Sequence, residues 1–425
     1  MEHRKLVFRM VALVALALVS SYGFAAEYES LYGKPLATAH PMLGRDPQRT
    51  GYTDLPGPMA EPEVAWKLEV GAPGGGCMGQ PVLDADGNVA LPFSYRSPED
   101  NNRQSTVISV DPAGKERWRF GPIGVNRTSY SSLAITSDGM LTRALGNGEL
   151  YGITGDVGGK AWSTPLYATR ISSAPVIDRE GAIWLGAQAG GGLFHIDGKT
   201  GEALGEIDIE EDGAGTVALS VKEKTAYVGR PGAFFAVSTA KKEVVWRFVP
   251  ENEEASRFGW GSPLVGKGDV VYAQEESKGI VYAIEDKGKH AELMWTFDTG
   301  KPGDSPRGIG YDGKTLYAGT EGPDSILFAL NLDGTVKWQH AFPGGGLTCA
   351  PVVTPNAVYV GVDEDGGVYA FNPDDGALLW RKQVAAKGNS FGDAVMIGPN
   401  GVLYVGVGGT PENSEQAALV ALAAR

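Results

Sequence analysis

An aromatic residue recurs along this chain at nearly constant intervals, and this regularity limits the possible folds more than any other feature. The intervals are 43, 45, 45, 42 and 45 residues between Trp184, Tyr227, Tyr272, Tyr317, Tyr359 and Tyr404. A second marker, a tryptophan, recurs with a similar period at Trp118, Trp162, Trp246, Trp295, Trp338 and Trp380. Two independent markers therefore indicate one repeated structural unit.

Each unit contains the pattern of four short strands. In the copy at residues 350–384, apolar alternation is interrupted near residues 354–356, 363–367 and 372–376 by Asp, Asn, Gly and Pro, which favour tight turns. Gly commonly precedes the tryptophan by four residues and supplies the last turn. One unit departs from the pattern, because Gly205 stands where the tryptophan is expected and His195 replaces a small residue of the third strand.

Four strands in some 43 residues, repeated along the chain, are typical of a β-propeller. Seven copies end in a complete fourth strand, and an eighth copy lacks one. The missing strand is present near the N-terminus as Glu63–Val70. We therefore expect an all-β, eight-bladed propeller of four-stranded antiparallel blades in which Glu63–Val70 closes the ring and removes the open edges. The propeller domain spans residues 61–425, after a lead-in at residues 27–60.

The first 26 residues have the order of a secretory signal peptide. Arg4, Lys5 and Arg9 precede or enter an apolar run that reaches Val19, and small residues follow it. The run is too short for a comfortable membrane span. No Cys follows it for lipid attachment. We expect a cleaved signal peptide at residues 1–26 and a periplasmic or secreted protein that does not span the membrane.

The cysteine content allows one disulfide at most, because Cys77 and Cys349 are the two cysteines of the chain. They lie near the start of equivalent repeat segments. Two buried free thiols are the favoured interpretation, and a bridge between them is the alternative. Histidines are few, and none is expected to reach the central channel, so acid-base catalysis by histidine lacks a candidate.

The charge of the chain is acidic, with 51 Asp and Glu against 37 Lys and Arg and a net charge of −14. This balance argues against a nucleic-acid partner. Several blades nevertheless place a basic residue just before the innermost strand, with aromatic residues nearby. These positions predict an anion site at the channel mouth, formed by Arg127, Tyr130, Arg170, Arg257, Trp260, Arg307, Lys387 and Phe391. Alternatively, each arginine pairs with a neighbouring carboxylate and ties loops together.

The repeat resembles that of the pyrroloquinoline-quinone (PQQ)-like β-propellers over residues 40–425. The resemblance rests on VYAFNPDDGALLW at residues 368–380, on LFALNLDGTVKW at residues 327–338, and on GRDPQRTG at residues 44–51, which is similar to the lead-in of secreted members. It implies the propeller fold and two alternative activities. Quinoprotein dehydrogenases hold PQQ and calcium in the channel under a disulfide between adjacent cysteines, which this chain lacks. Members of the outer-membrane assembly factor BamB type are periplasmic scaffolds, usually with a lipid-acceptor Cys, which is also missing here.

We therefore expect an exported, non-catalytic binding or scaffolding protein, without a cofactor or metal ion. Its partner would be a protein of the cell envelope, an anionic small molecule or an oligosaccharide, engaged at the channel mouth and the rim loops. The first alternative is a lyase-like enzyme on acidic polysaccharide that uses the arginines with Tyr130. The second is a quinoprotein dehydrogenase that uses PQQ with calcium.

Overall fold

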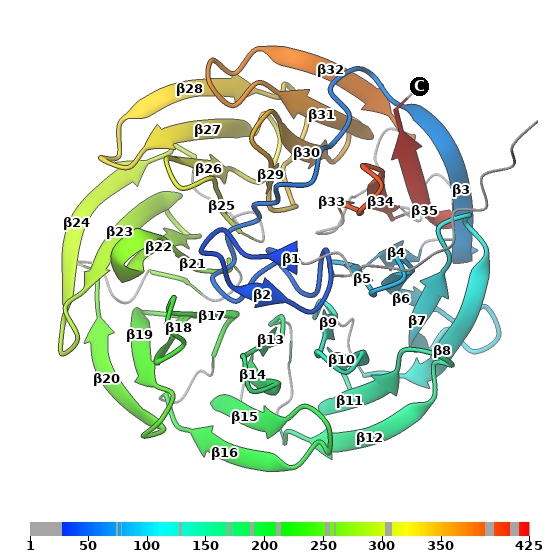
Figure 1. Ribbon diagram of the computed structural model, residues 1–425, viewed down its shortest axis with the longest axis horizontal. Helices are drawn as coiled ribbons and strands as arrows, with labels where there is room; N and C mark the ends of the chain where they lie inside the picture. Colours follow the sequence, from blue (N-terminus) through cyan, green and yellow to red (C-terminus); the bar gives the residue numbers. More distant parts are fainter. Residues whose placement is uncertain are drawn as a thin grey trace, which may run out of the picture.

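The computed structural model describes residues 28–73, 75–77, 79–126, 130–167, 171, 173–187, 191–209, 214–250, 256–258, 261–301, 308–386, 395–408 and 416–424. Eight antiparallel sheets stand around a central axis and form a ring (Figure 1). The predicted all-β, eight-bladed propeller is confirmed. The predicted signal peptide lies outside the described residues. No helix of the described part has the length and apolar character needed to cross a membrane.

Blades 1 to 7 take their strands from the axis outward in chain order, and blade 8 adds an outermost strand from the N-terminal part. Blade 1 contains β4 (Gly76–Cys77), β5 (Val82–Leu83), β6 (Val89–Arg96), β7 (Arg103–Val110) and β8 (Glu116–Gly124). Blade 2 contains β9 (Ala134–Ile135), β10 (Met140–Ala144), β11 (Glu149–Thr154) and β12 (Lys160–Pro165). Blade 3 contains β13 (Val176–Ile177), β14 (Ala182–Gly186), β15 (Leu193–Asp197) and β16 (Ala203–Ile207). Blade 4 contains β17 (Val217–Leu219), β18 (Thr225–Arg230), β19 (Ala233–Ser238) and β20 (Glu243–Phe248).

The second half of the ring repeats this order. Blade 5 contains β21 (Leu264–Val265), the 3-10 helix η2 (Lys267–Asp269), β22 (Val270–Glu275), β23 (Ile280–Asp286) and β24 (Ala291–Asp298). Blade 6 contains β25 (Gly310–Tyr311), β26 (Thr315–Gly319), β27 (Ile326–Asn331) and β28 (Val336–Ala341). Blade 7 contains β29 (Val352–Val353), β30 (Val358–Val362), β31 (Gly367–Phe371) and β32 (Leu378–Gln383). Blade 8 contains β33 (Val395–Ile397), β34 (Leu403–Val407), β35 (Gln416–Ala423) and β3 (Glu63–Pro73).

The two ends of the propeller domain meet in blade 8, as predicted. Strand β3 pairs antiparallel with β35, with Glu63 opposite Ala423 and Leu68 opposite Leu419. The strand begins at the predicted residue and extends beyond Val70. Because the outermost strand of blade 8 comes from the segment that leads into blade 1, it joins the first and last blades and closes the ring.

Neighbouring blades pack through a tryptophan laid over a glycine. The outer-strand tryptophan of one blade lies against the glycine of the last turn of the next, as Trp118 does on Gly158 and Trp338 on Gly376. A Cβ atom on Gly158 would come 2.4 Å from the Trp118 ring, and the glycine has a φ of +68°. The glycine that precedes each tryptophan therefore does more than turn the chain, because it also makes room for the indole of the preceding blade.

The lead-in fills the central channel at the end where the innermost strands finish. Its strands β1 (Tyr28–Glu29) and β2 (Pro35–Leu36) pair across the axis (Figure 1), and residues 38–51 are all buried. Carbonyl groups of this segment accept hydrogen bonds from the last residue of six innermost strands, namely Leu83, Ile135, Leu219, Val265, Tyr311 and Val353. The chain thus closes its own channel at this face of the ring, which we call the lead-in face.

Two arginines fasten the lead-in from within. The Arg49 guanidinium donates to the carbonyl oxygens of Leu43 at 2.7 Å, Val217 at 2.9 Å, Ala174 at 3.0 Å and Pro175 at 3.1 Å. Burial lowers its pKa to about 9. Because the guanidinium satisfies carbonyls of two blades and of the lead-in itself, it holds three segments together.

Arg45 secures the N-terminal part of the same segment. Its Nε donates to the Ala39 carbonyl at 2.9 Å, and its Nη1 donates to the carbonyls of Glu29 and Tyr52 at 2.8 and 2.9 Å. His40 is buried beside it, so the expectation that no histidine reaches the channel is wrong. The sequence repeat could not predict the position of the lead-in, because residues 27–60 contain no copy of the repeat.

Candidate functional site

Most residues of the predicted anion site lie outside the described part of the chain. Six of its members lie outside the described residues, namely Arg127, Arg170, Trp260, Arg307, Lys387 and Phe391. The two described members belong to different connections, since Tyr130 precedes blade 2 and Arg257 precedes blade 5. Both residues come before the start of an innermost strand, β9 and β21, whereas the lead-in pairs with the ends of these strands. The anion ring stays a prediction.

Arg257 is exposed, and its backbone N–H donates to the Glu275 carboxylate at 2.9 Å. Arg257 also forms an isolated antiparallel β-bridge with Pro231. Tyr130 is half-buried. These contacts fix the backbone of Arg257, and they do not determine where its guanidinium group points.

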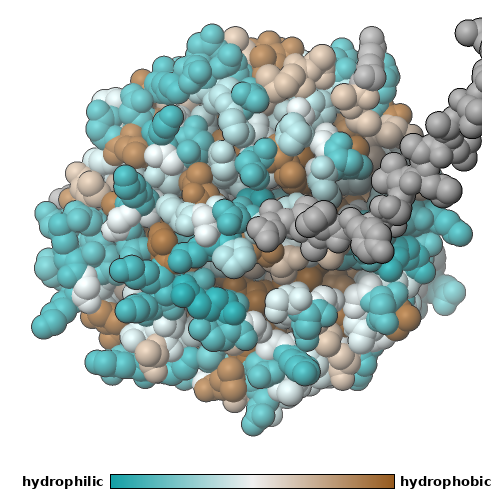
Figure 2. Space-filling view, in the orientation of Figure 1, coloured by the Kyte–Doolittle hydropathy of each residue, from teal (hydrophilic) through white to brown (hydrophobic). Residues whose placement is uncertain are grey.

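Blade 3 departs from the regular structure near the axis. The lead-in passes from the Ile135 N–H of blade 2 to the Leu219 N–H of blade 4, and in the described chain it makes no backbone pairing with Ile177 of blade 3. A cavity of about 440 Å³ lies at this place, which we call the inner cavity. Leu36, Met42 and Ile177 are among its lining residues. Figure 2 shows apolar surface on the floor of a hollow between the lead-in strands and blade 3.

Blade 3 also departs near the rim, where the repeated tryptophan is missing. Gly205 takes its place in β16, and Lys242 takes the place of the glycine that would face it in blade 4. Lys242 keeps the left-handed backbone of the glycine, with a φ of 60°. Its side-chain carbons come 3.9 Å from the position that a Cβ of Gly205 would occupy. The two departures are coupled, because a lysine fits at this turn only when no indole lies over it.

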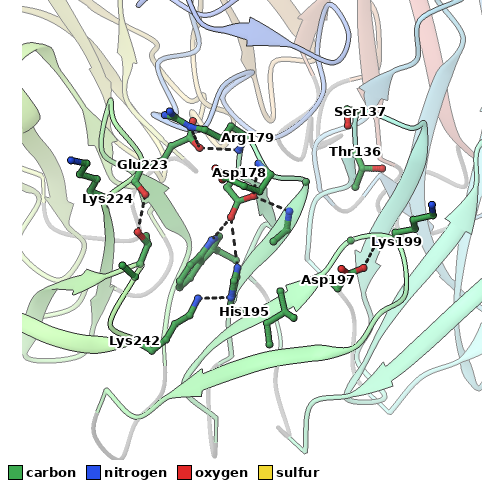
Figure 3. Close-up of a pocket in the computed structure, with 18 of the residues that line it drawn as sticks. Thr136, Ser137, Asp178, Arg179, His195, Asp197, Lys199, Glu223, Lys224 and Lys242 are labelled. Atoms are coloured by element: carbon green, nitrogen blue, oxygen red, sulfur yellow. Dashed lines mark hydrogen bonds and ion pairs between the residues drawn. The ribbon is translucent and has the colours of Figure 1, made fainter.

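The space left by the indole opens into a cavity of about 680 Å³, which we call the outer cavity. Lys242 enters it from the blade 4 side, with His195 and Asp178 on the blade 3 side (Figure 3). Ser137, Asp178, Arg179 and Glu223 line both cavities, so the two form one depression that runs over blade 3 from the axis toward the rim.

A connected row of four side chains forms the floor of the outer cavity. The Lys242 ammonium contacts Nδ1 of His195 and lies 4.2 Å from the centre of the Trp184 ring. His195 stacks on Trp184 with ring centres 4.2 Å apart, and its Nε2 lies 3.7 Å from Oδ2 of Asp178. The indole N–H of Trp184 donates to the same oxygen at 2.9 Å. Since Nδ1 accepts from the ammonium, a neutral His195 carries its proton on Nε2, facing Asp178.

The pKa directions follow from this arrangement. Burial lowers the pKa of Lys242, against the charge of Asp178, which favours the ammonium. Burial alone would raise the pKa of Asp178, but hydrogen bonds from His195, Trp184 and the Ala182 N–H outweigh it and hold that pKa below its ordinary value. Asp178 is thus a fixed carboxylate, and Lys242 is a cation in a partly desolvated place.

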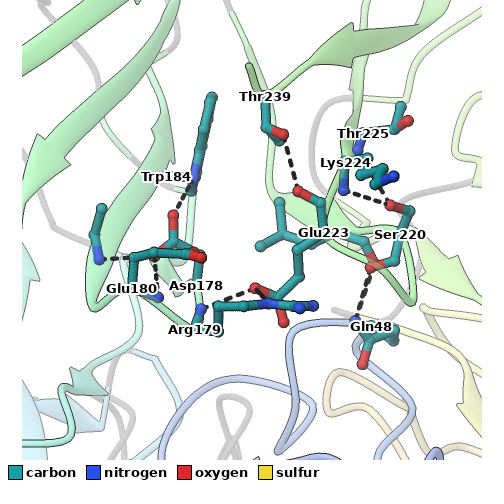
Figure 4. Close-up of polar contacts among 12 residues, drawn as sticks. Gln48, Asp178, Arg179, Glu180, Trp184, Ser220, Glu223, Lys224, Thr225 and Thr239 are labelled. Carbon is teal, nitrogen blue, oxygen red and sulfur yellow. Dashed lines mark hydrogen bonds and ion pairs between the residues drawn. The ribbon is translucent and has the colours of Figure 1, made fainter.

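An ion pair separates the inner cavity from the outer one. Oε2 of Glu223 accepts from the backbone N–H of Arg179 at 2.8 Å and from its Nε at 3.1 Å (Figure 4). The side amide of Gln48 donates to the Ser220 carbonyl at 3.1 Å in the same region. The lead-in, blade 3 and blade 4 therefore meet at this pair, and its side chains set the width of the passage.

The residues of the outer cavity were absent from the predicted site. The sequence does carry the signal, because Gly205 breaks the tryptophan series, His195 breaks the series of small residues in the third strand, and Lys242 breaks the glycine series. Read together, three departures at one blade interface indicate a local structure of its own. One exception alone does not predict such a structure, because repeats commonly vary at single positions.

The two cysteines are buried, unbonded thiols. Sγ of Cys77 lies 3.4 Å from the Val407 carbonyl oxygen, while Sγ of Cys349 lies 3.6 Å from that of Gly361. Burial raises the pKa of Cys77 to about 12. The alternative of a Cys77–Cys349 disulfide is therefore not realised in this structure, and the favoured interpretation of free thiols agrees with it.

Comparison with known proteins assigns the chain to a family. The family described as "Outer membrane protein assembly factor BamB" matches residues 189–303 and 277–409, which together make up just over half of the chain. The chain belongs to this BamB family of PQQ-like propellers. The predicted family resemblance is confirmed.

A curated relative and two solved structures each match this chain over most of their own length and most of its length. The outer membrane protein assembly factor BamB of Moranella endobia (strain PCIT) is 24% identical over 413 residues, which cover 89% of this chain and 93% of that protein. The structure of BamB from Moraxella catarrhalis has a TM-score of 0.63 at 15% identity, covering 85% of this chain and 99% of that one. The quinohemoprotein alcohol dehydrogenase from Comamonas testosteroni has a TM-score of 0.67 at 14% identity, covering 90% and 80%.

These two structural likenesses show the fold that BamB and a quinohemoprotein dehydrogenase share with this chain. They do not choose between the two activities. The choice has to come from the residues of this member of the BamB family, and above all from what fills its channel.

Proposed function

We propose that this protein is an exported, non-catalytic binding or scaffolding protein of the cell envelope that serves outer-membrane protein assembly. The observation that carries the proposal is the closure of the channel by the chain's own lead-in. Residues 38–51 are buried there, and six blades donate backbone hydrogen bonds to this segment. A partner would then engage the exposed turns and loops on the two faces of the ring.

The closure matters because propellers with a reaction centre on the axis need access to it. Entry from the lead-in face would break the four hydrogen bonds of Arg49 as well as the backbone pairing of the lead-in. Each buried carbonyl left without a donor costs on the order of 1–3 kcal/mol. Removal of the lead-in is therefore expensive on the scale of protein stability, which favours a channel that stays shut at this end.

The quinoprotein alternative was tested against the residues present. PQQ with calcium needs a flat slot on the axis and a set of oxygen ligands for the metal ion. In the described residues the lead-in fills the axis at one end, and no group of three His, Cys, Asp or Glu side chains comes together to hold a metal ion. Cys77 and Cys349 are far apart in sequence and unbonded, so no adjacent-cysteine disulfide can cover a cofactor. The closed axis at the lead-in face and the missing pair of adjacent cysteines therefore support a binding role over a quinoprotein.

The lyase alternative needs an arginine beside Tyr130 to neutralise a uronate. The arginines that the sequence places nearest in the channel, Arg127 and Arg170, lie outside the described residues.

Export to the periplasm is part of the proposal. It is supported by the signal-peptide pattern of residues 1–26 and by relatives named for outer-membrane protein assembly. A scaffold of this kind meets its partners in the envelope, which agrees with an acidic chain that lacks the charge expected of a nucleic-acid-binding protein.

Crosslinking in the source cells tests the proposal directly. A photoreactive residue is placed at exposed Tyr167, at the end opposite the lead-in, at exposed Glu180 on the lead-in face, and at Val336 on the outer strand of blade 6 as a lateral control. We expect a discrete adduct with an outer-membrane assembly protein from Tyr167 or Glu180 and none from Val336. Purified protein incubated with PQQ and calcium serves as the enzymatic control.

Dye-linked alcohol oxidation by that preparation, or release of unsaturated uronate from acidic polysaccharide, would contradict the non-catalytic role. The absence of adducts from all three positions would contradict the scaffolding role. An adduct from Val336 alone would place the partner on the side of the ring and overturn the assignment to the two faces.

A further inference from the structure

We propose that the outer cavity is a binding site for an organic oxyanion, a carboxylate or a phosphate ester, which pairs with the Lys242 ammonium. The site goes beyond the proposed scaffolding role and does not depend on it. It rests on the coupled departures at Gly205 and Lys242, on the lack of a described carboxylate in contact with the Lys242 ammonium and on the cavity's size.

The first step of the argument is that Lys242 lacks a direct counter-ion. Its ammonium contacts a histidine nitrogen and the face of Trp184, and no carboxylate of the described residues lies within ion-pair distance of it. Asp178 is reached only through His195. A cation that is partly removed from water gains most from an anion placed against it, because the desolvation cost is already met within the fold.

The second step concerns the other charges of the cavity. Its carboxylates are largely engaged by the protein: Glu223 accepts from Arg179, and Asp197 accepts the backbone N–H groups of Lys199 and Thr200 at 2.9 and 2.7 Å. Glu180 is exposed at the rim. By contrast, four lysines of the cavity make no ion pair with a described carboxylate, namely Lys199, Lys222, Lys224 and Lys242.

The cavity lining thus carries five basic residues, Arg179 and these four lysines, and five acidic ones, Asp138, Asp178, Glu180, Asp197 and Glu223. The attraction for an anion is therefore local to the Lys242 ammonium, which no carboxylate of the described residues contacts. In the view of Figure 3, Lys242 turns inward to His195, while Lys199 and Lys224 lie at the periphery. This arrangement favours one pairing contact, between the ligand and Lys242 at the floor of the cavity.

The third step is the shape of the site. A volume of about 680 Å³ lies within the range of small-molecule sites. Leu204, with 47% of its surface exposed, lines the wall together with Ala240 and the stem of Lys242. These apolar groups would contact the carbon frame of a ligand. The geometry thus favours an organic anion over a bare inorganic one.

Isothermal titration of the mature protein with D-glucuronate, glycerol 1-phosphate and uncharged D-glucose tests the site. We expect saturable binding of at least one of the two anions and none of glucose. Lys242→Gln should weaken that binding by about tenfold or more, since it removes the charged partner. The matched control is Lys241→Gln, because Lys241 is an exposed neighbour paired with Glu243 at 3.1 Å and lies outside the cavity lining. Added salt should weaken the binding further.

A second variant restores the repeat instead of deleting a charge. Gly205→Trp combined with Lys242→Gly rebuilds the tryptophan over glycine seen at other interfaces and fills the slot, so we expect a folded protein that binds neither anion. Thermal unfolding distinguishes loss of the site from loss of the fold.

Glucuronate binding without glycerol 1-phosphate binding would identify a carboxylate ligand, and the reverse a phosphate ester. No saturable binding of either anion, equal binding of glucose, or unchanged affinity in Lys242→Gln would overturn the proposal. The crosslinking experiment on the scaffolding role is unaffected by any of these results.

Discussion

The packing of blades predicts that the same substitution, to alanine, costs much more stability in one blade than at the equivalent position of another. Gly158 and Lys242 occupy the same place in the last turn of blades 2 and 4, both with a positive φ, of 68° and 60°. Gly158 faces the Trp118 ring of the preceding blade, whereas Lys242 faces Gly205. Replacing each by alanine therefore tests whether this turn needs a glycine only where a tryptophan of the preceding blade lies over it.

The magnitudes follow from the contacts. In Gly158→Ala the new Cβ stands 2.4 Å from the Trp118 ring, which forces overpacking at about 1–3 kcal/mol, and the left-handed backbone adds about 1 kcal/mol. We expect the free energy of unfolding to fall by about 2–4 kcal/mol. Lys242→Ala keeps a backbone that already carries a side chain and loses a cation–π contact, so its cost should stay below about 1 kcal/mol.

Urea unfolding followed by tryptophan fluorescence measures both variants under identical conditions, with equal slopes as the check that the transition is unchanged. A cost below about 1 kcal/mol for Gly158→Ala would refute the steric argument. Equal costs for the two variants would refute the claim that Gly205 and Lys242 are coupled.

Three further predictions concern buried groups. Arg49→Met should lower the free energy of unfolding in urea by about 3–5 kcal/mol, because four carbonyls lose a charged donor, and a loss no larger than that of exposed Arg119→Met would contradict this role. Burial lowers the pKa of His40 to about 4, below the ordinary 6.5. Between these two pH values the unfolded chain therefore binds more protons than the folded one. The free energy of unfolding should fall by about 2 kcal/mol from pH 7 to pH 4.5. His40→Gln should flatten this slope in urea titrations, and an unchanged slope would place the titrating group elsewhere. A thiol reagent at pH 8 should find no reactive thiol in the native protein and two after denaturation, whereas none after denaturation would indicate a disulfide.

The fold was predictable because its signals repeat. Counting the repeats gives seven complete units and one that lacks its outer strand. Glu63–Val70 has the alternating apolar pattern of a strand, and the structure pairs it in that place. The position of the lead-in was not predictable in the same way. Its segment is held by backbone carbonyls and by Arg45 and Arg49, and such contacts leave no periodic pattern in the side chains.

The candidate site illustrates a second limit. The predicted ring of basic residues came from their common place before the innermost strands, and most of it, such as Arg170 and Arg307, lies outside the described residues. The outer cavity arises instead from a pair, Gly205 with Lys242, whose members belong to adjacent blades. Each exception was visible in the sequence, but their contact depends on how one blade stacks on the next.

The most direct test of the scaffolding account is the amount of correctly assembled outer-membrane protein in source cells that lack this chain. We predict that deletion lowers this amount, and that the wild-type chain restores it without PQQ being supplied. Unchanged assembly, together with the loss of a PQQ-dependent dehydrogenase activity from the periplasm, would contradict the account and favour the quinoprotein alternative.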